Sequence, residues 1–287
     1  MSRGGRAREV PGGRLPNFLL IGAPKAGSTA LADYLREHPD VFIPPEKEIY
    51  FFDMQFDRGL DWYRSRFAAA TTERAVGDAT PTYLYADRAL EAMATVIPDA
   101  RLLVILRNPV DRAYSSYWYE RALTERRSFE EAVRAEIDGT LRNLPKRRPY
   151  LDTGRYLPRL ERVASLFGRA ALCVVTLEEM RVDPAGVFRE VCRFIGVDDS
   201  FVPSNLGAIR NPSYRVRWPA VRRAMFRYRA WRRLPRGWAN ALDRLNRAEF
   251  RYPPLDAALR AELSALFAED NRALAAWLGK DLDAWSG

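Results

Sequence analysis

The sequence has little lysine, histidine and cysteine. Among its 287 residues there are four lysines, one histidine and two cysteines. The cysteines, Cys173 and Cys192, offer neither a disulfide framework nor the ligand spacing of a metal site, and their apolar neighbours in the sequence predict buried thiols. The single histidine, His38, excludes a histidine-rich metal site, and its place after a helical segment predicts a helix-end residue.

Long apolar runs are also missing. Residues 1–14 are rich in glycine and arginine and carry no apolar core of the kind that a secretory signal peptide needs. No later run approaches the roughly 20 apolar residues of a membrane-spanning helix. We therefore expect a disordered tail over residues 1–14, no transmembrane segment and a cytoplasmic location.

The positive charge is almost entirely arginine. The net charge is +9, and hydrophobic residues make up 47% and charged residues 29% of the chain, which is a globular composition. Much arginine with little lysine is typical of a GC-rich bacterial genome, and a basic surface suits an anionic ligand, a nucleic acid or a membrane. The length allows one large domain with a helical extension or two small domains. We expect a single domain over residues 15–287.

Patterns of buried strands and amphipathic helices alternate along the chain. Strands are predicted at residues 17–22, 41–43, 75–79, 101–106 and 171–176. Helices are predicted at residues 29–37, 57–67, 88–97, from 109 onward, 128–138, 156–167, 184–195 and 255–278. Such alternation is typical of a parallel sheet covered by helices. We expect a three-layer α/β fold with a central parallel sheet, a P-loop-like nucleotide-binding core and a helical C-terminal region.

The first predicted strand runs into the loop Gly22-Ala-Pro-Lys-Ala-Gly-Ser-Thr29, and a helix follows. This order aims backbone N–H groups and a helix N-terminus at a phosphate. Nucleoside-triphosphate-binding loops place lysine directly after the second glycine, whereas Ser28 stands there and Lys25 lies in mid-loop. The strand at residues 101–106 also ends in Arg107 instead of an acidic metal ligand. The loop predicts an anion site without a metal ion; a tight turn without a ligand is the alternative.

A second anion site is predicted after the strand at residues 101–106. Arg107 follows the carboxyl end of this strand, where open α/β sheets bind ligands. Ser115 lies about two turns into the next helix. A guanidinium has the planar geometry that suits a phosphate, so we expect Arg107 and Ser115 to hold one together. The alternative is an arginine that caps a helix or forms a local ion pair.

Three motifs in this order resemble a known family. They are Asn17-Phe-Leu-Leu-Ile-Gly-Ala-Pro-Lys-Ala-Gly-Ser-Thr29, Lys47-Glu-Ile-Tyr-Phe-Phe-Asp53 and Leu106-Arg-Asn-Pro-Val-Asp-Arg-Ala-Tyr-Ser115. Three further segments fit: Gly77–Tyr83, Thr153–Tyr156 and Leu278–Trp285. The chain resembles, over roughly residues 16–286, the sulfotransferases that use 3′-phosphoadenosine 5′-phosphosulfate (PAPS). It is most similar to the bacterial members that are like heparan sulfate sulfotransferases.

The resemblance implies roles for particular residues. The loop residues implied to cradle the 5′-phosphosulfate are Lys25, Ala26, Gly27, Ser28, Thr29 and Ala30. Lys25 is expected beside the bridging oxygen, and Arg107 with Ser115 at the 3′-phosphate. Gly154, Arg155 and Tyr156 lie where the family closes over the nucleotide.

The resemblance also implies the reaction. A sulfuryl group passes in line from PAPS to a hydroxyl or amine of a small-molecule or carbohydrate acceptor, and no metal ion is needed. Glu48 occupies the position of the carboxylate base, with Asp53 and Asp78 as reserve candidates. Residues 49–52, which follow Glu48, are apolar and predict a short strand, which would keep this carboxylate partly desolvated. The alternative for Glu48 is a surface carboxylate paired with Lys47 or Arg58.

Two departures from the family pattern concern the base and the cofactor's 3′ side. Family members that act on phenols and steroids use a histidine base, and His38 is not placed for that role. Heparan-type members carry a disulfide-bonded loop, but residues 200–250 contain no cysteine pair. The acceptor cleft and the 3′ side of the cofactor site are therefore expected to be built differently.

An arginine-rich segment follows the predicted sheet. Residues 210–252 hold thirteen arginines, no lysine and two acidic residues, and we treat residues 205–252 as an insertion or lid. The sequence leaves open what this segment faces: a polyanion, a membrane surface that it contacts peripherally, the acceptor cleft, or solvent. The arrangement matches no nucleic-acid-binding module, so we expect no nucleic-acid partner. The oligomeric state is left open.

Two other functions stay open at this point. A nucleoside-triphosphate kinase of similar topology would depend on ATP and Mg²⁺, which the position of Lys25 argues against. A non-catalytic binding protein with a degenerate site would bind the nucleotide, and the loss of Glu48 would change nothing measurable.

Overall fold

The computed structural model describes residues 13–46, 48–122, 124–140, 149–207, 214–216, 218, 247–249 and 252–285. They belong to two compact units: the first spans Met1–Leu106 and Pro158–Ala208, and the second spans Arg107–Leu157 and Ile209–Gly287. The predicted tail at residues 1–14 and the arginine-rich segment lie largely outside the described residues. The single domain expected over residues 15–287 stays a prediction.

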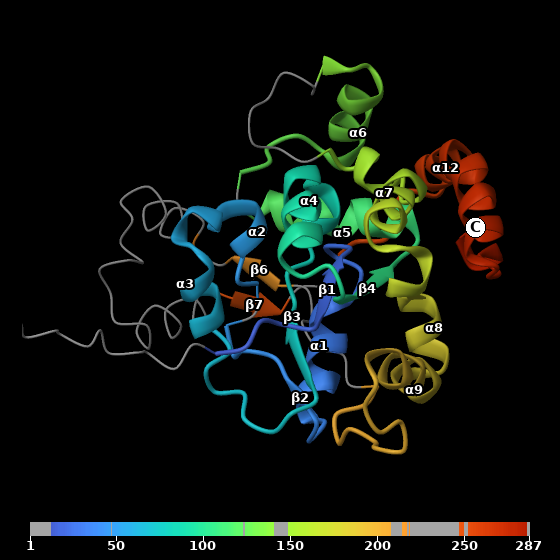
Figure 1. The fold of residues 1–287 in the computed structure, drawn as a ribbon. Coiled ribbons are helices and arrows are strands. Elements are labelled where there is room, and N and C mark those ends of the chain that lie inside the picture. Colours follow the sequence, from blue (N-terminus) through green and yellow to red (C-terminus); the bar gives the residue numbers. More distant parts are fainter. Residues whose placement is uncertain are drawn as a thin grey trace, which may run out of the picture. The chain divides into compact units, whose positions relative to one another are not determined.

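The first unit is built on a five-stranded parallel sheet with the strand order β2-β3-β1-β4-β5 (Figure 1). The strands are β1 (Phe18–Gly22), β2 (Val41–Phe42), β3 (Ala75–Asp78), β4 (Arg101–Leu106) and β5 (Leu172–Thr176). Every residue of β1, β3 and β5 is buried. Runs that are apolar on both faces are what a sheet covered on both sides requires.

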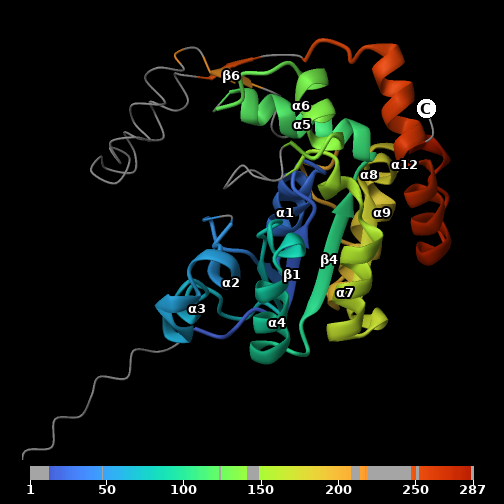
Figure 2. The ribbon, with the colours of Figure 1, turned by 90° about the horizontal axis from the view of Figure 1, so that it is seen from above.

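Helices cover both faces of this sheet. The chain moves in one direction across the sheet from β1 through α1 (Ser28–Glu37) to β2, and in the other direction through α4 (Asp87–Val96) and α7 (Leu157–Phe167). Right-handed connections therefore place α1 on one face and α4 and α7 on the other. Figure 1 agrees: α4 and α7 lie above β1 and β4, and α1 and α9 (Pro184–Ile195) lie below them. Figure 2 shows the same elements from above, with β4 running beside α7. The predicted three-layer α/β fold is confirmed.

Two local predictions were wrong. The apolar residues 49–52 predict a strand, but Phe51–Met54 form the short helix α2. Contacts with residues outside the helix stabilise it: the Tyr83 hydroxyl accepts the N–H of Phe51 at 2.9 Å, and the rings of Phe51 and Tyr63 stack with their centroids 4.2 Å apart. The single helix predicted at residues 57–67 is divided by Gly59, with φ at 80°, into η1 (Phe56–Arg58) and α3 (Leu60–Ser65).

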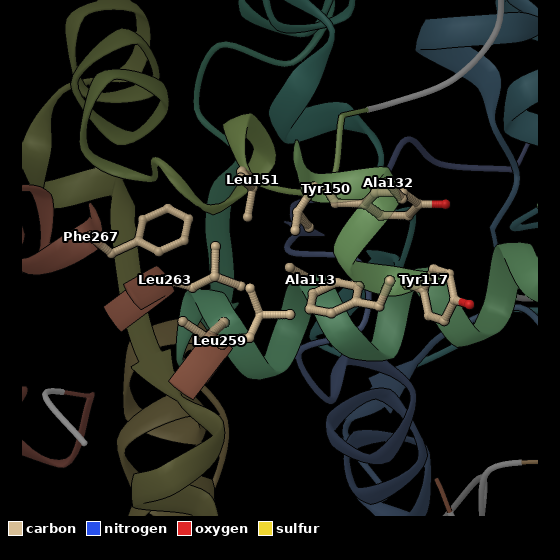
Figure 3. Close-up of a cluster of buried hydrophobic side chains, with 11 residues drawn as sticks. Ala113, Tyr117, Ala132, Tyr150, Leu151, Leu259, Leu263 and Phe267 are labelled. Carbon is tan, nitrogen blue, oxygen red and sulfur yellow. The ribbon is translucent and has the colours of Figure 1, made fainter. Parts of the chain in front are cut away.

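The second unit is mainly helical. Its elements are α5 (Pro109–Arg121), α6 (Phe129–Ile137), η4 (Asp152–Gly154), β6 (Tyr214–Val216), β7 (Arg247–Glu249), α12 (Ala257–Leu278) and η7 (Asp283–Trp285). Figure 3 shows its core, in which α5, α6 and α12 direct apolar side chains towards one another and towards Tyr150 and Leu151. The strands β6 and β7 pair in antiparallel fashion. The predicted helical C-terminal region is confirmed for α12.

The two cysteines and the single histidine are buried in the first unit. Cys173 and Cys192 are buried and free, and burial raises the pKa of the Cys192 thiol to about 12. His38 ends α1, and its Nδ1 accepts the N–H of Asp40 at 3.0 Å. Its Nε2 therefore carries the proton that bonds the carbonyl of Asp198 at 2.8 Å. His38 is thus a helix-end residue, as predicted.

Candidate functional site

The glycine loop after β1 is a tight, half-buried turn. Lys25 and Gly27 have left-handed backbones, with φ at 70° and 103°. The N–H of Ala23 donates to the carbonyl of Ile105 at 2.7 Å, which ties the loop to the end of β4. A Cβ atom at Gly27 would lie 2.9 Å from Leu177, so only glycine fits there. The predicted strand–loop–helix arrangement is present.

The loop leads directly into the N-terminus of α1. Gly27 is the N-cap, and no acidic residue lies in the first turn. The first N–H groups of any helix have no carbonyl partner inside it, and the helix dipole adds positive potential there. Ser28 is buried, and Lys25 is half-buried. Backbone N–H groups, a hydroxyl and an ammonium group therefore belong to one short segment, which suits an anion.

Glu48 lies at the same edge of the sheet as the Lys25 loop. Its N–H donates to the carbonyl of Ala79 at 3.2 Å, immediately after β3. Strand β3 pairs with β1, which ends where the loop begins. Adjacent strands lie about 4.8 Å apart, so the loop after β1 and Glu48, which is hydrogen-bonded just beyond the end of β3, lie at the carboxyl ends of neighbouring strands.

The carboxylate of Glu48 is half-buried and accepts a hydrogen bond from the hydroxyl of Tyr50. One pairing considered from the sequence was with Arg58. Its guanidinium instead donates to Gln55 at 3.1 Å and lies 4.2 Å from the ring centroid of Trp62. The other pairing considered, with Lys47, lies outside the described residues.

Behind Glu48, a buried hydrogen-bond network starts from Asp78. Its carboxyl group accepts from the hydroxyls of Thr80, Tyr63 and Tyr83 at 2.7, 2.9 and 3.0 Å. Burial is the largest cause that raises the pKa of Asp78 to about 6, and these hydrogen bonds oppose the shift. Only 1% of Asp78 is exposed, so an acceptor cannot reach this reserve candidate, and its carboxyl group serves the hydrogen-bond network instead. Asp53, the other reserve, accepts from the hydroxyl of Thr82.

Arg107 and Ser115 belong to the second unit. Arg107 directly follows β4 and is half-buried, while Ser115 is buried on α5. Between them, Asn108 caps α5 by accepting the N–H groups of Val110 and Asp111 at 2.9 and 3.2 Å. An asparagine before a proline at the first helical position is a strong start signal. The helix that the sequence places after Arg107 is confirmed.

The segment Gly154–Tyr156 also lies in the second unit. A Cβ atom at Gly154 would lie 2.9 Å from Pro109. Arg155 pairs with Asp270 of α12, and its guanidinium lies 6.0 Å from the ring centroid of Phe267. Tyr156 is 1% exposed, and its hydroxyl donates to the carbonyl of Arg107 at 2.7 Å. The structure thus links this segment to Arg107.

The predicted site residues therefore form two groups, one in each unit. The first comprises the loop from Lys25 to Ala30 together with Glu48, and the second comprises Arg107, Ser115 and Gly154–Tyr156. Tyr50 and Asn108 were not proposed from the sequence. The sequence contains the signal for Asn108, an asparagine before a proline at the start of a helix. The contact of Tyr50 with Glu48 depends on a left-handed backbone, which no sequence pattern predicts.

The described segments contain neither a metal-binding cluster nor a helix that could span a membrane. No group of three or more histidine, cysteine, aspartate or glutamate side chains is arranged there to hold a metal ion. Every helix in the same segments is too short or too polar to cross a membrane.

Comparisons with known proteins identify the family. The model of the sulfotransferase domain matches residues 15–210. The human bifunctional heparan sulfate N-deacetylase/N-sulfotransferase 3 is 30% identical over 289 residues, which cover 95% of this chain and 31% of the human protein. The membrane-associated sulfotransferase kil1 of Dictyostelium discoideum is 33% identical over 134 residues, 43% of this chain and 28% of that protein. The chain thus spans about a third or less of the length of these relatives.

A solved structure gives the same family. The sulfotransferase of Alicyclobacillus acidocaldarius matches with a TM-score of 0.72 at 30% identity, over 96% of this chain and 100% of that one. The match extends beyond the sheet to nearly the whole chain. Together with the family model, which covers more than half of the residues, it leads to one conclusion: the chain belongs to the sulfotransferase family.

Proposed function

We propose that this chain moves the sulfuryl group of PAPS to a hydroxyl or amine of a small-molecule or carbohydrate acceptor. The proposal rests chiefly on one observation: the Lys25 loop follows β1, and Glu48 is hydrogen-bonded to Ala79 at the carboxyl end of the neighbouring strand β3. A cationic anion-binding loop and a carboxylate base are the two groups that such a transfer needs side by side.

The loop suits the phosphosulfate end of PAPS in charge, because it combines the Lys25 ammonium group with the N-terminus of α1. Gly27 has no side chain, and Leu177 lies too close for one. The backbone at the start of α1 is therefore uncovered there, and a phosphate group can approach it. Lys25 through Ala30 hold this end. Arg107 and Ser115 hold the 3′-phosphate, and Gly154 and Arg155 border the nucleotide.

Sulfuryl transfer resembles phosphoryl transfer, in which catalysis consists mostly of positioning and charge stabilisation. PAPS supplies a leaving group that departs as a phosphate. The ammonium group of Lys25 stabilises the negative charge that develops on that phosphate. The carboxylate of Glu48 accepts the proton that the acceptor loses, and Tyr50 holds this carboxylate in place.

A carbohydrate is the favoured acceptor class. The human relative is named for heparan sulfate, and it is 30% identical over nearly the whole of this chain. Hydroxyl and amine groups both occur on saccharides, so the chemistry of Glu48 suits either position.

Thermal-shift and calorimetric titrations test the nucleotide. We expect adenosine 3′,5′-bisphosphate to raise the melting temperature, because a ligand at 100 times its Kd stabilises a folded protein by about 2.7 kcal/mol. ATP with Mg²⁺ should have little effect. Stabilisation by ATP with Mg²⁺ and none by the bisphosphate would contradict the proposal and favour a kinase.

Turnover with radiolabelled PAPS tests the reaction itself. The acceptor panel should include saccharides with free hydroxyl groups, saccharides with free amines, and small phenols. We expect labelled product with a saccharide. Tight binding of the bisphosphate with no transfer to any acceptor would support a binding protein instead.

A further inference from the structure

Arg107 lies where the chain leaves the sheet and begins α5, so its backbone decides where its guanidinium points. A phosphate ligand is recognised well only when its partners are held within a fraction of an ångström of the right geometry. The residues that fix the Arg107 backbone are therefore as important as the guanidinium.

Two buried contacts of the second unit fix this stretch of backbone. The Tyr156 hydroxyl donates to the Arg107 carbonyl at 2.7 Å, and Tyr156 is 1% exposed. The next residue, Asn108, caps α5 and also donates its side-chain N–H to the carbonyl of Trp285 at 3.4 Å. Trp285 is 1% exposed as well.

The two contacts reinforce each other. The rings of Tyr156 and Trp285 lie 6.0 Å apart at an interplanar angle of 59°, within the range of favourable aromatic pairs. Tyr156, Trp285 and the Arg107–Asn108 backbone thus form one connected cluster, which we call the Arg107 brace. It joins residues that are up to 178 positions apart, since Trp285 lies in η7 close to the end of the chain.

The turn that leads into Tyr156 is itself held firmly. The Glu136 carboxylate accepts the N–H groups of Tyr150, Leu151 and Asp152 at 2.6, 2.9 and 2.8 Å. The buried guanidinium of Arg112 donates to the carbonyl of Tyr150. Tyr156 therefore approaches Arg107 from a fixed turn.

We propose that Tyr156 and Trp285 are positioning residues that set the phosphate-binding geometry of Arg107, and that Tyr156 acts through the Arg107 backbone instead of contacting the nucleotide. This inference rests on the proposed function, in which Arg107 binds the 3′-phosphate. It gives the ends of two segments, Thr153–Tyr156 and Leu278–Trp285, a common role at one residue.

Affinities for two nucleotides test the inference. Tyr156→Phe removes one hydroxyl and keeps the ring. Calorimetry with adenosine 3′,5′-bisphosphate should show affinity lowered by about three- to tenfold, the effect of one lost hydrogen bond. Affinity for adenosine 5′-monophosphate, which lacks the 3′-phosphate, should be unchanged. Equal losses for both nucleotides, or no loss for either, would overturn the positioning role.

Arg107→Ala provides the reference. It should lower affinity for the bisphosphate and leave the monophosphate unaffected, and adding Tyr156→Phe to it should cause no further loss. If Arg107→Ala keeps the full preference for the bisphosphate, the phosphate assignment fails and the positioning role fails with it. If Arg107→Ala loses the preference but Tyr156→Phe does not, the positioning role alone is wrong.

Tyr117→Phe is the matched control. Tyr117 is buried in the same unit, and its hydroxyl donates to the carbonyl of Arg127 at 3.0 Å, away from Arg107. We expect both nucleotide affinities to stay as in the wild type. If Tyr156→Phe does not fold, Trp285→Phe tests the brace from its other end, with the same selective loss expected and a non-selective loss overturning the inference.

Discussion

The hydroxyl of Tyr50 donates a hydrogen bond to the carboxylate of Glu48, two residues earlier in the same loop. Both residues have left-handed backbones, with φ at 54° for Tyr50 and 68° for Glu48. Residues other than glycine rarely adopt this conformation. The loop is therefore shaped by its contacts, and one result is that the proposed base has a fixed orientation.

Tyr50→Phe should lower kcat by about three- to tenfold, since hydrogen bonds to charged groups are stronger than neutral ones. Affinity for adenosine 3′,5′-bisphosphate should not change, because the ring remains and the glycine loop is untouched. Steady-state kinetics with PAPS and a saturating acceptor measure the effect. Tyr119→Phe, at a position that is 43% exposed, is the control. A loss of nucleotide affinity in Tyr50→Phe would contradict the assigned role.

Glu48→Gln keeps the size of the side chain and removes its ability to accept a proton. We expect kcat to fall by about 10²–10⁴-fold, the usual contribution of a general base. The Kd for the bisphosphate should stay near that of the wild type. Glu46→Gln, on an exposed side chain in the same loop, should leave kcat unchanged. Full activity in Glu48→Gln would end the assignment.

Lys25→Met removes the ammonium group and keeps the apolar stem. Loss of one group that stabilises developing charge costs about 10²–10³-fold in kcat. Nucleotide affinity should fall as well, because the proposed function places the same ammonium group against the bound anion. Single-turnover kinetics with PAPS separate the two effects. The control is Lys280→Met, beyond α12, which should behave as the wild type. A Lys25→Met enzyme with normal single-turnover rates would exclude Lys25 from the reaction.

Asp78 makes stability depend on pH. Because its pKa in the folded protein is about 6, against an ordinary value of 3.8, the folded state holds the proton more tightly than the unfolded state. Stability from this group is therefore greatest below pH 4 and falls as the pH rises towards 6, by roughly 3 kcal/mol at most. Urea denaturation of the wild type and Asp78→Asn across this range measures the effect.

The comparison with Asp78→Asn cancels the other carboxyl groups. The free energy of unfolding of the wild type, taken relative to that of the variant, should be highest near pH 4 and level off above pH 6. Asp78→Asn should also carry a constant penalty, since an amide nitrogen cannot accept the hydroxyl of Thr80. A difference that does not vary with pH would show that folding does not raise the pKa of Asp78.

Gly27→Ala should damage both stability and the anion site. Alanine at a φ of 103° is strained, and its Cβ atom would lie 2.9 Å from Leu177. We expect a loss of more than about 1 kcal/mol in unfolding free energy and weaker binding of the bisphosphate. Gly59→Ala separates the two causes, because Gly59 has φ at 80° with open space around it. Equal losses in the two variants would mean that crowding at Gly27 is unimportant.

Much of the sheet could be predicted because its strands are apolar on both faces and end at clear signals. Strand β4 and helix α9 begin and end at the predicted residues, and α9 is bounded by Pro184 and by Gly196. The short apolar run at residues 49–52 carries no such signals, and its secondary structure could not be predicted because four residues fit a strand or a helix equally well. There, the contacts of Phe51 with Tyr63 and Tyr83 decided the outcome.

One helix was overlooked although the sequence contained its signal. Thr176 and Glu179 form a capping box at the start of α8 (Leu177–Val182), and threonine followed three residues later by glutamate is the usual pattern. The candidate site was predictable where a loop follows a strand, as at Lys25 and Arg107. The Arg107 brace was not, because its members meet only after the chain has folded.

The burial of both cysteines makes the chain convenient for site-directed labelling. The Cys192 thiol, with a pKa near 12 and no exposed surface, forms almost no reactive thiolate at neutral pH, and Cys173 is shielded by its own burial. A cysteine introduced on the surface would then be the preferred target of a maleimide dye, with no native residue to remove first. Val182 in the first unit is 87% exposed and Ile137 in the second is 49% exposed. Cysteines at these two positions would carry a donor and an acceptor fluorophore, and energy transfer measured with and without nucleotide would test whether the separation of the two positions changes.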